Sequence, residues 1–417
     1  MKYDIKDLQK APEGQKLIQW ASNEMPVLNL IRLRFSISKP LSGVTLAACL
    51  HVTSETANLM ITLVSGGAKV VLCASNPLST NDAVASALVE NHKIPVFAIK
   101  GEDNQTYYKH LNQAADYKPN LTMDDGCDLV TLIHQKRTEL IKDVVGSCEE
   151  TTTGVIRLKA MAKARELKIP VLAVNDNQTK HLFDNRYGTG QSTIDGIIRA
   201  TNVLLAGRSF VICGYGWCGR GVANRARGMG SNVVVCEIDP IKALEAKMDG
   251  FLVMPLIKAI VNADIVLTTT GNKYVITEKH FMKAKNRVIL AQAGHFDIEI
   301  NKGALKKLSK KVSQVRPFVE EYDLGNKKIY LLAEGRLVNL AAAEGHPASV
   351  MDMSFSGQAL AAEYLWRNKG KLKPKVYKLP EKLDRSIASM KLKSQGISID
   401  KLSQEQKKYL TSWREGT

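Results

Sequence analysis

The stretch Ser209-Phe210-Val211-Ile212-Cys213-Gly214-Tyr215-Gly216-Trp217-Cys218-Gly219 decides how the middle of this chain folds. An apolar, β-branched run leads directly into a G-x-G-x-x-G pattern, and a helix-compatible segment, residues 222–229, follows it. In such a pattern Gly214 makes the tight turn, Gly216 lets the backbone approach a pyrophosphate, and Gly219 lets helix and strand pack closely. The following helix would direct its N-terminal N–H groups at the phosphates.

A second apolar run, Asn232–Cys236, ends at Glu237, about 20 residues beyond the glycines. The dinucleotide fingerprint has a carboxylate at this place to bind ribose hydroxyls, and an acid there favours NAD over NADP. A G-x-G-x-x-G pattern alone is also compatible with a glycine-rich turn between a strand and a helix. Strand, glycines, helix, second strand and terminal acid together predict a dinucleotide-binding unit.

Length and composition bound what the rest of the chain can be. With 417 residues the chain is too long for one ordinary core, so two or three domains are expected. No stretch is apolar enough for a signal peptide or a bilayer span, which argues against a membrane partner. The seven cysteines are scattered, mostly in apolar runs, and predict reduced core residues of a cytoplasmic protein.

The formal net charge of +17 raises the question of a nucleic-acid partner. The basic residues are spread along the chain, and no basic patch interleaved with aromatic residues is present. The densest basic run, Lys369–Lys382, is typical of a solvated face or connector. We therefore expect no nucleic-acid binding.

Short apolar runs alternate with helix-compatible segments along most of the chain. Residues 1–35 have an amphipathic helical pattern, with an apolar face that includes Ile18, Trp20 and Leu30. Strands are predicted at residues 44–50, 69–74, 95–99, 170–174, 264–270, 287–293 and 328–332. This alternation is typical of parallel sheets covered by helices on both faces. The predicted fold class is α/β, with two doubly wound, parallel, Rossmann-like sheets and a short helical C-terminal tail.

Two further segments connect the predicted strands. An apolar segment, Leu129–His134, follows the acidic turn Asp124-Asp125-Gly126. A glycine break is expected around Tyr187–Gly190, before a helix over residues 192–204 that leads into the dinucleotide unit.

Polar residues at the ends of the predicted strands are candidates for chemistry, because ligands of open α/β sheets bind at the carboxyl ends of strands. In the first half these are His51, Asn76, Asp125 and Glu150, followed by Lys180 with Asp184. Each has an ordinary structural explanation. Asp125 could form an Asp-Gly turn, Lys180 and Asp184 could form a helix ion pair, and His51 could be a helix-start residue.

As a set, these residues resemble a known family, S-adenosylhomocysteine hydrolase (adenosylhomocysteinase), over nearly the whole chain. The similar segments are His51-Val52-Thr53-Ser54-Glu55-Thr56, Asp124-Asp125-Gly126, Glu149-Glu150-Thr151-Thr152-Thr153-Gly154, Asn175-Asp176, Phe183-Asp184-Asn185, the glycine loop, Thr268-Thr269-Thr270-Gly271, Gly294-His295-Phe296-Asp297, Ala333–Leu340 and Gly345-His346-Pro347.

The resemblance implies reversible hydrolysis of S-adenosyl-L-homocysteine to adenosine and L-homocysteine through a transient oxidation. Direct displacement of homocysteine by water at the 5′ thioether carbon of a nucleoside is unfavourable. Oxidation at C3′ by tightly bound NAD acidifies the C4′ proton, so that homocysteine leaves by β-elimination. Water then adds, and the ketone is reduced again.

The resemblance also implies roles for individual side chains. Lys180, beside Asp184, would take the 3′-hydroxyl proton, and would need to be deprotonated, which burial or the nearby cationic nicotinamide could favour. Asp125 would be the base at C4′, and His51 with His295 would handle the leaving thiol and the incoming water. Glu150 would hold ribose hydroxyls or share in acid–base work. How the work divides among His51, Asp125 and His295 stays open.

The remaining site residues are carried over from the same resemblance. Nucleoside contacts are expected from Thr53, Glu55, Thr56, Asn76, Asn339 and His346. Cofactor contacts are expected from Thr151, Thr152, Thr153, Asn185, Gly214, Tyr215, Gly216, Trp217, Cys218, Gly219, Glu237, Lys242, Thr269, Thr270, Gly271, Asn272, Ala293, Gly294, Asn339 and Tyr409. No metal site is predicted.

The family architecture implies an NAD domain inserted into a substrate domain. The expected boundaries are 1–188 with 348–395 for the substrate domain, 189–347 for the NAD domain, and 396–417 for a tail that contacts a neighbouring subunit of a homotetramer. Linkers near Thr189 and Ala348 would form the hinge that closes the site.

The chain departs from the family pattern at a few places. Thr189 replaces a common cysteine, Lys242 replaces an amide, Glu344 replaces an apolar residue near the nucleoside, and Asn81 replaces a glutamine linked to an alkali cation. The tail ends soon after Tyr409, as in a shorter archaeal or thermophilic form.

Three alternative functions remain open from the sequence. A silent nucleotide-binding regulator would have lost catalytic residues, yet Lys180, Asp184, Asp125 and His51 are present. A plain NAD-dependent dehydrogenase leaves the segments Glu149–Gly154 and His51–Thr56 unexplained. A third alternative keeps the mechanism but uses S-inosyl-L-homocysteine.

Overall fold

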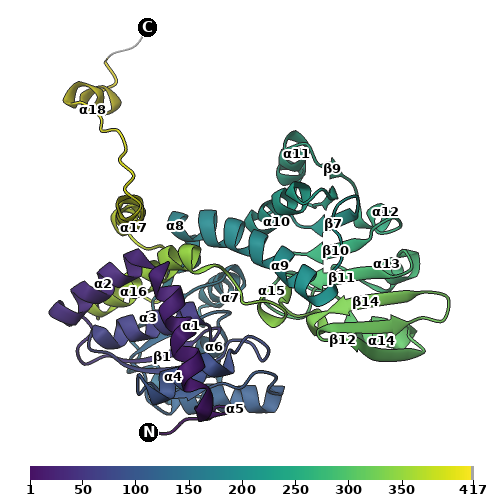
Figure 1. Ribbon diagram of the computed structural model, residues 1–417. Coiled ribbons are helices and arrows are strands. Elements are labelled where there is room, and N and C mark those ends of the chain that lie inside the picture. The colour runs from purple at the N-terminus through teal and green to yellow at the C-terminus, as the bar shows by residue number, and fades with distance from the viewer. Residues whose placement is uncertain (415–417) are drawn as a thin grey trace.

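Two β-sheets, each covered by helices, organise the chain and lie side by side in Figure 1. The structure is a computed structural model that describes residues 1–414. No helix within these residues combines the length and the apolar character needed to cross a bilayer.

The first sheet has seven parallel strands in the order β15-β6-β5-β4-β1-β2-β3. Its strands are β1 (Thr45–Cys49), β2 (Lys69–Cys73), β3 (Val96–Phe97), β4 (Leu121–Asp124), β5 (Gly146–Glu149), β6 (Val171–Ala173) and β15 (Val376–Tyr377). The winding direction reverses between β1 and β4, and crevices for ligands open at such switch points. The parallel, doubly wound order predicted for this sheet is confirmed.

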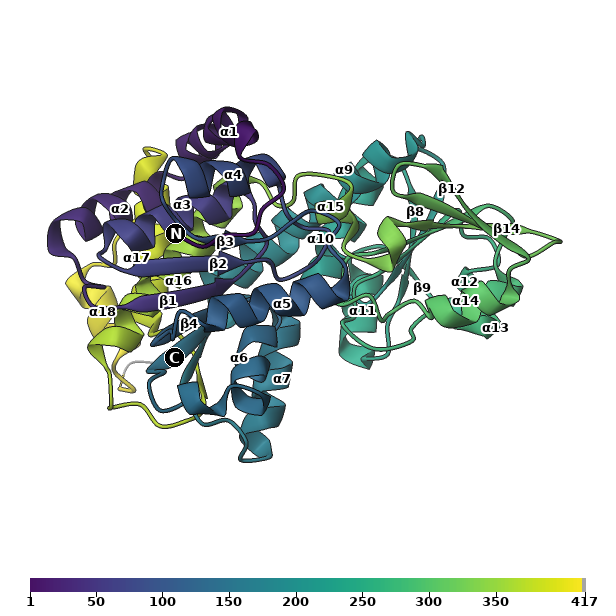
Figure 2. The ribbon, with the colours of Figure 1, turned by 90° about the horizontal axis from the view of Figure 1, so that it is seen from below.

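Helices cover both faces of this sheet, as Figure 2 shows. One layer contains α1 (Ala11–Asn23), α2 (Pro26–Ser38), α3 (Ser54–Ser65), α4 (Asp82–Glu90) and α16 (Ala348–Arg367), and the other α5 (Asn104–Ala115), α6 (Asp128–Gln135) and α7 (Thr152–Lys163). Along β1, Leu46 and Ala48 pack in the first layer while Ala47 and Cys49 pack in the second. All four are fully buried, as expected for a strand of a parallel sheet.

Some details of the first half differ from the predictions. Strand β4 is not among the predicted strands, and the apolar segment 129–134, for which the sequence predicts no element, is part of helix α6. A short apolar run alone does not distinguish a strand from a buried helix. Trp20 and Leu30 are exposed by 76% and 50%, because they lie on the outer sides of α1 and α2 while Ile18 packs inward.

The second sheet has eight strands in the order β12-β13-β14-β11-β10-β7-β8-β9. They are β7 (Ser209–Cys213), β8 (Asn232–Cys236), β9 (Leu252–Val253), β10 (Ile265–Thr268), β11 (Val288–Gln292), β12 (Lys311–Arg316), β13 (Val319–Asp323) and β14 (Lys328–Leu332). The six neighbouring strands β9-β8-β7-β10-β11-β14 are parallel and doubly wound, as predicted. An antiparallel pair, β12 and β13, extends the β14 edge and makes this sheet mixed.

The helices of the second sheet also form two layers. One contains α9 (Thr189–Thr201) and α10 (Trp217–Gly228), and the other α12 (Leu256–Ala259), α13 (Glu278–Lys283) and α14 (Lys302–Leu308). Helices α11 (Pro240–Met248), α15 (Val338–Ala341) and η5 (Ala333–Gly335) also belong to this half. The short η1 (Leu8–Lys10), η2 (Thr138–Leu140) and η3 (Val174–Asp176) belong to the first half.

The chain enters the second sheet through a continuous helix, so the predicted glycine break at Tyr187–Gly190 is wrong. Helix α8 (Gln178–Lys180) continues into the π-wound η4 (His181–Gly188) and then α9. The glycines serve close packing instead. A Cβ on Gly190 would lie 2.7 Å from the Gly221 backbone, and one on Gly188 would lie 3.1 Å from His346.

After the second sheet the chain returns to the first. Helix α16 packs on it, β15 adds its edge strand, and α17 (Glu381–Ser394) packs against α16, α2 and α8. Helix α18 (Gln404–Leu410) projects away from the body in Figure 1. The last three residues of the expected tail, 415–417, lie outside the described residues.

Candidate active site

A cavity of about 1320 Å³ lies between the two sheets and is lined from both. The first sheet and its loops contribute His51, Thr53, Glu55, Thr56, Asp125, Glu150 and Thr151–Thr153. The second contributes Gly214, Gly216, Glu237, Lys242, Thr269–Asn272, Ala293, Gly294 and His295. Ligand pockets usually measure about 300–1000 Å³, so this cavity has room for a dinucleotide and a second molecule.

The glycine loop has the shape that a dinucleotide requires. Gly214 has a φ of 98°, which favours glycine, and a Cβ on Gly219 would lie 2.0 Å from the Gly214 carbonyl oxygen. A Cβ on Gly216 would meet nothing within 4 Å, so its face is open. Helix α10 starts directly after Gly216 and presents its N-terminal N–H groups there. The loop therefore fits NAD.

Glu237 stands at the end of β8, where the fingerprint requires an acid. Its carboxylate accepts hydrogen bonds from the Tyr215 amide at 2.6 Å and the Ile238 amide at 2.7 Å, and it still lines the cavity. Lys242 lines the cavity beside it, with Nζ 3.9 Å from the Asp239 carboxylate.

A buried carboxylate that sequence analysis missed orders the loop after β10. Glu299, fully buried, accepts hydrogen bonds from the Thr270 amide at 2.9 Å, the Thr270 hydroxyl at 2.7 Å and the Gly271 amide at 3.0 Å. Its position in the segment after Phe296 carries no sequence signal for this contact. Glu299 thus fixes two of the predicted cofactor residues.

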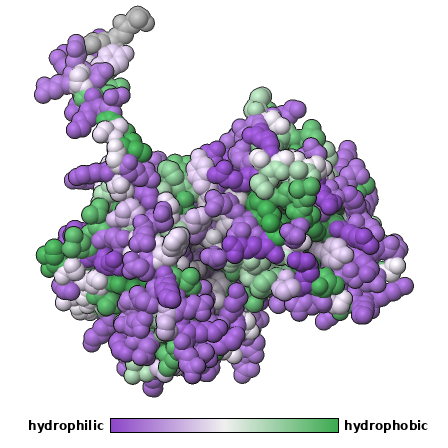
Figure 3. Space-filling view, viewed as in Figure 1, coloured by the Kyte–Doolittle hydropathy of each residue, from purple (hydrophilic) through white to green (hydrophobic). Residues whose placement is uncertain are grey.

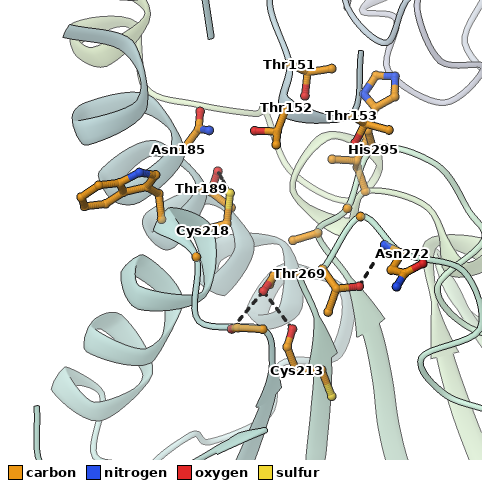
Figure 4. A pocket seen from close by; sticks show the side chains of 18 of the residues that line it. Thr151, Thr152, Thr153, Asn185, Thr189, Cys213, Cys218, Thr269, Asn272 and His295 are labelled. Carbon is orange, nitrogen blue, oxygen red and sulfur yellow. Dashed lines mark hydrogen bonds between the residues drawn. The ribbon is translucent and has the colours of Figure 1, made fainter. Parts of the chain in front are cut away.

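Figure 4 shows how the two halves face the same space. Thr151, Thr152 and Thr153 at the start of α7 lie across it from Thr269, whose hydroxyl donates to the Cys213 carbonyl at 3.0 Å. Asn185 and Thr189 approach from η4 and α9. The cofactor wall is therefore built by both sheets.

Lys180 lies at the centre of a buried cluster at the wall of this cavity. Its Nζ is 3.1 Å from Asp184 Oδ2, 3.6 Å from Glu150 Oε1 and 2.7 Å from Asn185 Oδ1. The Lys180, Asp184 and Glu150 side chains are nearly fully buried. Glu150 also accepts hydrogen bonds from the Ser354 hydroxyl and, at 2.5 Å, the Gln358 amide, both on α16. Sequence analysis did not identify Ser354 or Gln358.

The charges in this cluster stabilise one another. Burial alone would lower the pKa of Lys180, but the carboxylates of Asp184 and Glu150 outweigh it and raise that pKa well above its usual value. Burial raises the pKa of Glu150 to about 7, against the opposing effect of Lys180. Burial is likewise outweighed at Asp184, whose pKa is lowered by Lys180 and His346. The effect of burial that was expected to favour a neutral Lys180 is thus outweighed by the two carboxylates.

A second cluster contains His51, Asp125 and His295. His51 Nε2 is 3.3 Å from Asp125 Oδ2, and His295 Nδ1, from the loop after β11, is 3.6 Å from Asp125 Oδ1. Gly126 permits this approach, because a Cβ there would lie 2.4 Å from His295 Nε2. The candidate ligand atoms of the three residues lie within 4.8 Å of one another, a spacing that a metal ion could also use, although the sequence predicts none.

His51 is held neutral at physiological pH. Its Nδ1 lies 2.7 Å from the Ser79 hydroxyl and 3.1 Å from the Ser75 hydroxyl. Burial lowers the pKa of His51 to about 4 despite the neighbouring Asp125. A neutral imidazole between a carboxylate and two hydroxyls can accept or donate a proton.

The structure places most predicted site residues at the cavity, but not all. Asn76 does not line it; its side chain accepts the Leu78 amide in a turn, and its carbonyl accepts the Ser79 hydroxyl that contacts His51. The Tyr215 ring is buried beneath the loop, with its hydroxyl 2.6 Å from Asp249. Gly219 packs inside the loop, and Tyr409 lies exposed on α18.

Asn339, His346 and Thr189 line the cavity where the chain passes between the sheets. His346 Nε2 is 3.2 Å from the Thr189 hydroxyl, and its Nδ1 contacts Asp184. Glu344, expected near the nucleoside, points outward and pairs with Arg199 at 3.1 Å.

Comparison with known proteins identifies related sequences. A family model described as S-adenosyl-L-homocysteine hydrolase matches residues 2–140, and one described as S-adenosyl-L-homocysteine hydrolase, NAD binding domain, matches residues 185–345. An adenosylhomocysteinase of Aquifex aeolicus is 59% identical over 418 residues, and an S-inosyl-L-homocysteine hydrolase of Methanocaldococcus jannaschii is 58% identical over 415. An adenosylhomocysteinase of Saccharolobus solfataricus is 57% identical over 419 residues. Each match covers 100% of both chains.

Proposed function

Because the chain belongs to the S-adenosyl-L-homocysteine hydrolase family, we propose that it converts S-adenosyl-L-homocysteine reversibly to adenosine and L-homocysteine. It is a hydrolase of a nucleoside thioether, and NAD is its cofactor. One observation carries the proposal: the buried cluster of Lys180, Asp184 and Glu150 lines the same cavity as the glycine loop.

The residue roles below are part of the proposal. When bound, NAD would accept a hydride from C3′ and give it back at the end of the cycle. Lys180 accepts the proton of the 3′-hydroxyl after it has given up its own proton, and the positive charge of a bound nicotinamide would favour this neutral form. Glu150, whose carboxylate lies 3.6 Å from Lys180 Nζ, holds the ribose hydroxyls or shares in the acid–base work. Asp184 keeps Lys180 in place with a contact of 3.1 Å.

The second cluster handles the proton at C4′ and the bond to sulfur. Asp125 removes the C4′ proton and passes it to the neutral His51, 3.3 Å away, which then gives it to the leaving thiolate; the reverse path takes a proton from the incoming water. His295 completes the cluster from the other sheet and helps to exclude water from the ketone. Replacing Asp125 with Asn should abolish exchange of the C4′ proton with solvent and preserve the reduction of bound cofactor.

The test is a synthesis reaction with purified protein. Adenosine and L-homocysteine are added without NAD, and S-adenosyl-L-homocysteine is measured, together with the transient near-ultraviolet absorbance of a reduced nicotinamide. The proposal predicts both signals. Product formation that depends on added NAD would contradict the tightly bound cofactor, and absence of product with any nucleoside would contradict the proposal itself.

S-Inosyl-L-homocysteine is the second candidate substrate, because a relative of that name is as similar as the adenosylhomocysteinases. Glu55 lines the cavity, and burial raises its pKa, so this carboxyl can accept or donate a hydrogen bond at a base edge. Steady-state rates with the two thioethers decide between them.

We also propose the domain division 1–188 with 348–395, 189–347, and a tail from 396 onward. Supporting it, β15 and α16 complete the first sheet after the chain leaves the second. The hinge would then lie where η4 meets α9 near Thr189 and where α16 begins at Ala348. X-ray scattering with and without a nucleoside analogue tests whether the halves close.

A homotetramer is the proposed assembly. Ile238, Ile241, Leu244 and Met248 near α11 are exposed by 57–95%, and Figure 3 shows an apolar area over α10 and α11. The tail also exposes Leu410 and Trp413. Contiguous exposed apolar surface favours association. Light scattering on the wild type and Ile241→Glu measures the oligomeric state.

The remaining parts of the proposal concern cellular context. We propose a cytoplasmic enzyme of one-carbon metabolism and the methionine cycle that has neither nucleic acid nor membrane as a partner. Support comes from the cysteines, since all seven are unpaired and six are buried. Fractionation of the source cells, followed by immunoblotting, tests the location.

A further inference from the structure

Helix α17 is attached to the body by two buried polar side chains. Asp384 and Lys391 are each only 8% exposed. Lys391 Nζ binds Asp352 Oδ2 at 2.8 Å, and Asp352 in turn accepts the Leu28 amide at the start of α2. This contact fastens α17 to the helical layer and reaches no residue of the cavity.

Asp384 makes a different contact, directly before Lys180. Its Oδ2 accepts the Gln178 amide at 2.7 Å, and its Oδ1 accepts the Thr179 amide at 3.1 Å and the Thr179 hydroxyl. Gln178 and Thr179 are the first two residues of α8, and Lys180 is the third. The carboxylate therefore holds the backbone that presents Lys180.

No side chain next to α8 in the sequence caps the first N–H groups of this helix. The first N–H groups of a helix have no partner within the helix and need a cap. Asn177, in the cap position of α8, makes no side-chain cap, and its side-chain amide has no hydrogen-bond partner within residues 1–414. The cap is supplied instead by Asp384, more than 200 positions later in the chain.

The position of this helix start determines where the Lys180 amine lies. Immediately after Lys180 the backbone changes to the π-wound η4, which carries Asp184 and Asn185, the partners of Nζ. Hydrogen bonds from backbone amides to a carboxylate are stronger than neutral ones. A displacement of about 1 Å in an active site can reduce the rate about 10²-fold.

We propose that Asp384 is a positioning residue for the reaction: it fixes the start of α8 and thereby the amine of Lys180 against Asp184 and Glu150. Asp384 does not line the cavity and touches no reacting atom. The consequence for catalysis rests on the role proposed above for Lys180.

The experiment compares three variants with the wild type as holoenzymes. Asp384→Ala removes the cap, Asp384→Asn leaves one acceptor oxygen, and Lys391→Met removes the other buried anchor of α17. Hydrogen–deuterium exchange reports peptides that cover residues 177–189. Stopped-flow absorbance reports reduction of the bound cofactor by adenosine, measured over a range of pH.

We expect faster exchange of the Gln178 and Thr179 amides in both Asp384 variants and wild-type exchange there in Lys391→Met. Reduction should slow about 10²-fold in Asp384→Ala, less in Asp384→Asn, with a changed pH profile and little change in KM. Lys391→Met should lower the Tm but leave reduction within about twofold of the wild type.

Two results would overturn the proposal. If Lys391→Met slows reduction as much as Asp384→Ala, then Asp384 acts only by attaching α17. If exchange at residues 177–189 is unchanged in Asp384→Asn, the cap does not hold α8. Should Asp384→Ala fail to fold, Thr179→Val removes one of the same hydrogen bonds without changing α17. Failure of the proposed function is recognised separately, because Lys180→Met would then retain reduction.

Discussion

The two sheets of this molecule have the same winding but different loops at the switch point. Their central strands run in the orders β3-β2-β1-β4-β5-β6 and β9-β8-β7-β10-β11-β14. Even the cysteines correspond, since Cys49 and Cys73 are in register in the first sheet as Cys213 and Cys236 are in the second. The loop after β7 begins with Gly214, whereas the loop after β1 carries His51.

This difference shows how one topology serves two kinds of chemistry. Around the glycine loop, missing side chains leave space for backbone N–H groups to approach a phosphate. In the first sheet the corresponding ends carry His51, Asp125 and Glu150, which are titratable and largely buried. One sheet thus works through backbone shape, and the other through buried charge. Four substitutions test this contrast.

The largest effect is expected from Lys180→Met. Two buried carboxylates would lose their counter-ion, which should cost about 3–5 kcal/mol of stability, and proton transfer at C3′ should slow about 10²–10⁴-fold. Thermal unfolding and stopped-flow reduction measure the two effects. The double variant with Asp184→Asn should regain part of the stability and none of the activity. A stable, active Lys180→Met would refute the buried-charge interpretation of the first sheet.

The next test concerns the backbone of the second sheet. Gly219→Ala would place a Cβ 2.0 Å from the Gly214 carbonyl oxygen, so we expect a stability loss of about 1–3 kcal/mol and no bound NAD after purification. Gly216→Ala is the matched control, because its Cβ meets nothing within 4 Å. That variant should keep the wild-type Tm without cofactor and bind NAD more weakly. Equal behaviour of the two variants would contradict the distinct roles of these glycines.

A pH-dependent effect is expected at Glu150. Burial raises its pKa from 4.5 to about 7, so between these values the folded chain binds a proton that the unfolded chain lacks. The contribution of Glu150 to stability is therefore present below pH 4.5 and is lost as the pH rises through 7, by up to about 3 kcal/mol. Glu150→Gln should gain stability relative to the wild type between pH 5 and pH 8. A constant difference in Tm across this range would argue against the shifted pKa.

The smallest effect is expected at Glu299. This buried side chain belongs to the second sheet, where the proposed cofactor contacts otherwise come mainly from the backbone. Glu299→Gln keeps one acceptor oxygen for three donors, so the Thr270–Gly271 loop should loosen and NAD affinity should fall about tenfold, or about 1.4 kcal/mol. Titration calorimetry of the cofactor-free protein measures this. The exposed Glu278→Gln serves as the control and should bind NAD like the wild type.

The features that depend on residues close together in the chain could be predicted from the sequence. The strand before Gly214, the helix after it and the acid at Glu237 follow one another within a short stretch, and the structure has them as expected. The predictions were wrong where the packing of a segment depends on residues that are distant in the sequence. Gly188 and Gly190 look like a break in the sequence, yet both lie in a continuous helix, and their missing Cβ atoms let His346 and Gly221 pack against them.

The sequence by itself determined the two α/β sheets, the dinucleotide loop and the kinds of side chain at the strand ends, because each depends on patterns between near neighbours in the chain. Only the tertiary structure decided the raised pKa of Lys180, the partnership of His295 with Asp125, and the capping of α8 by Asp384. These depend on groups that are distant in sequence and become neighbours in a buried environment, where charge and burial oppose each other. No local pattern records that balance.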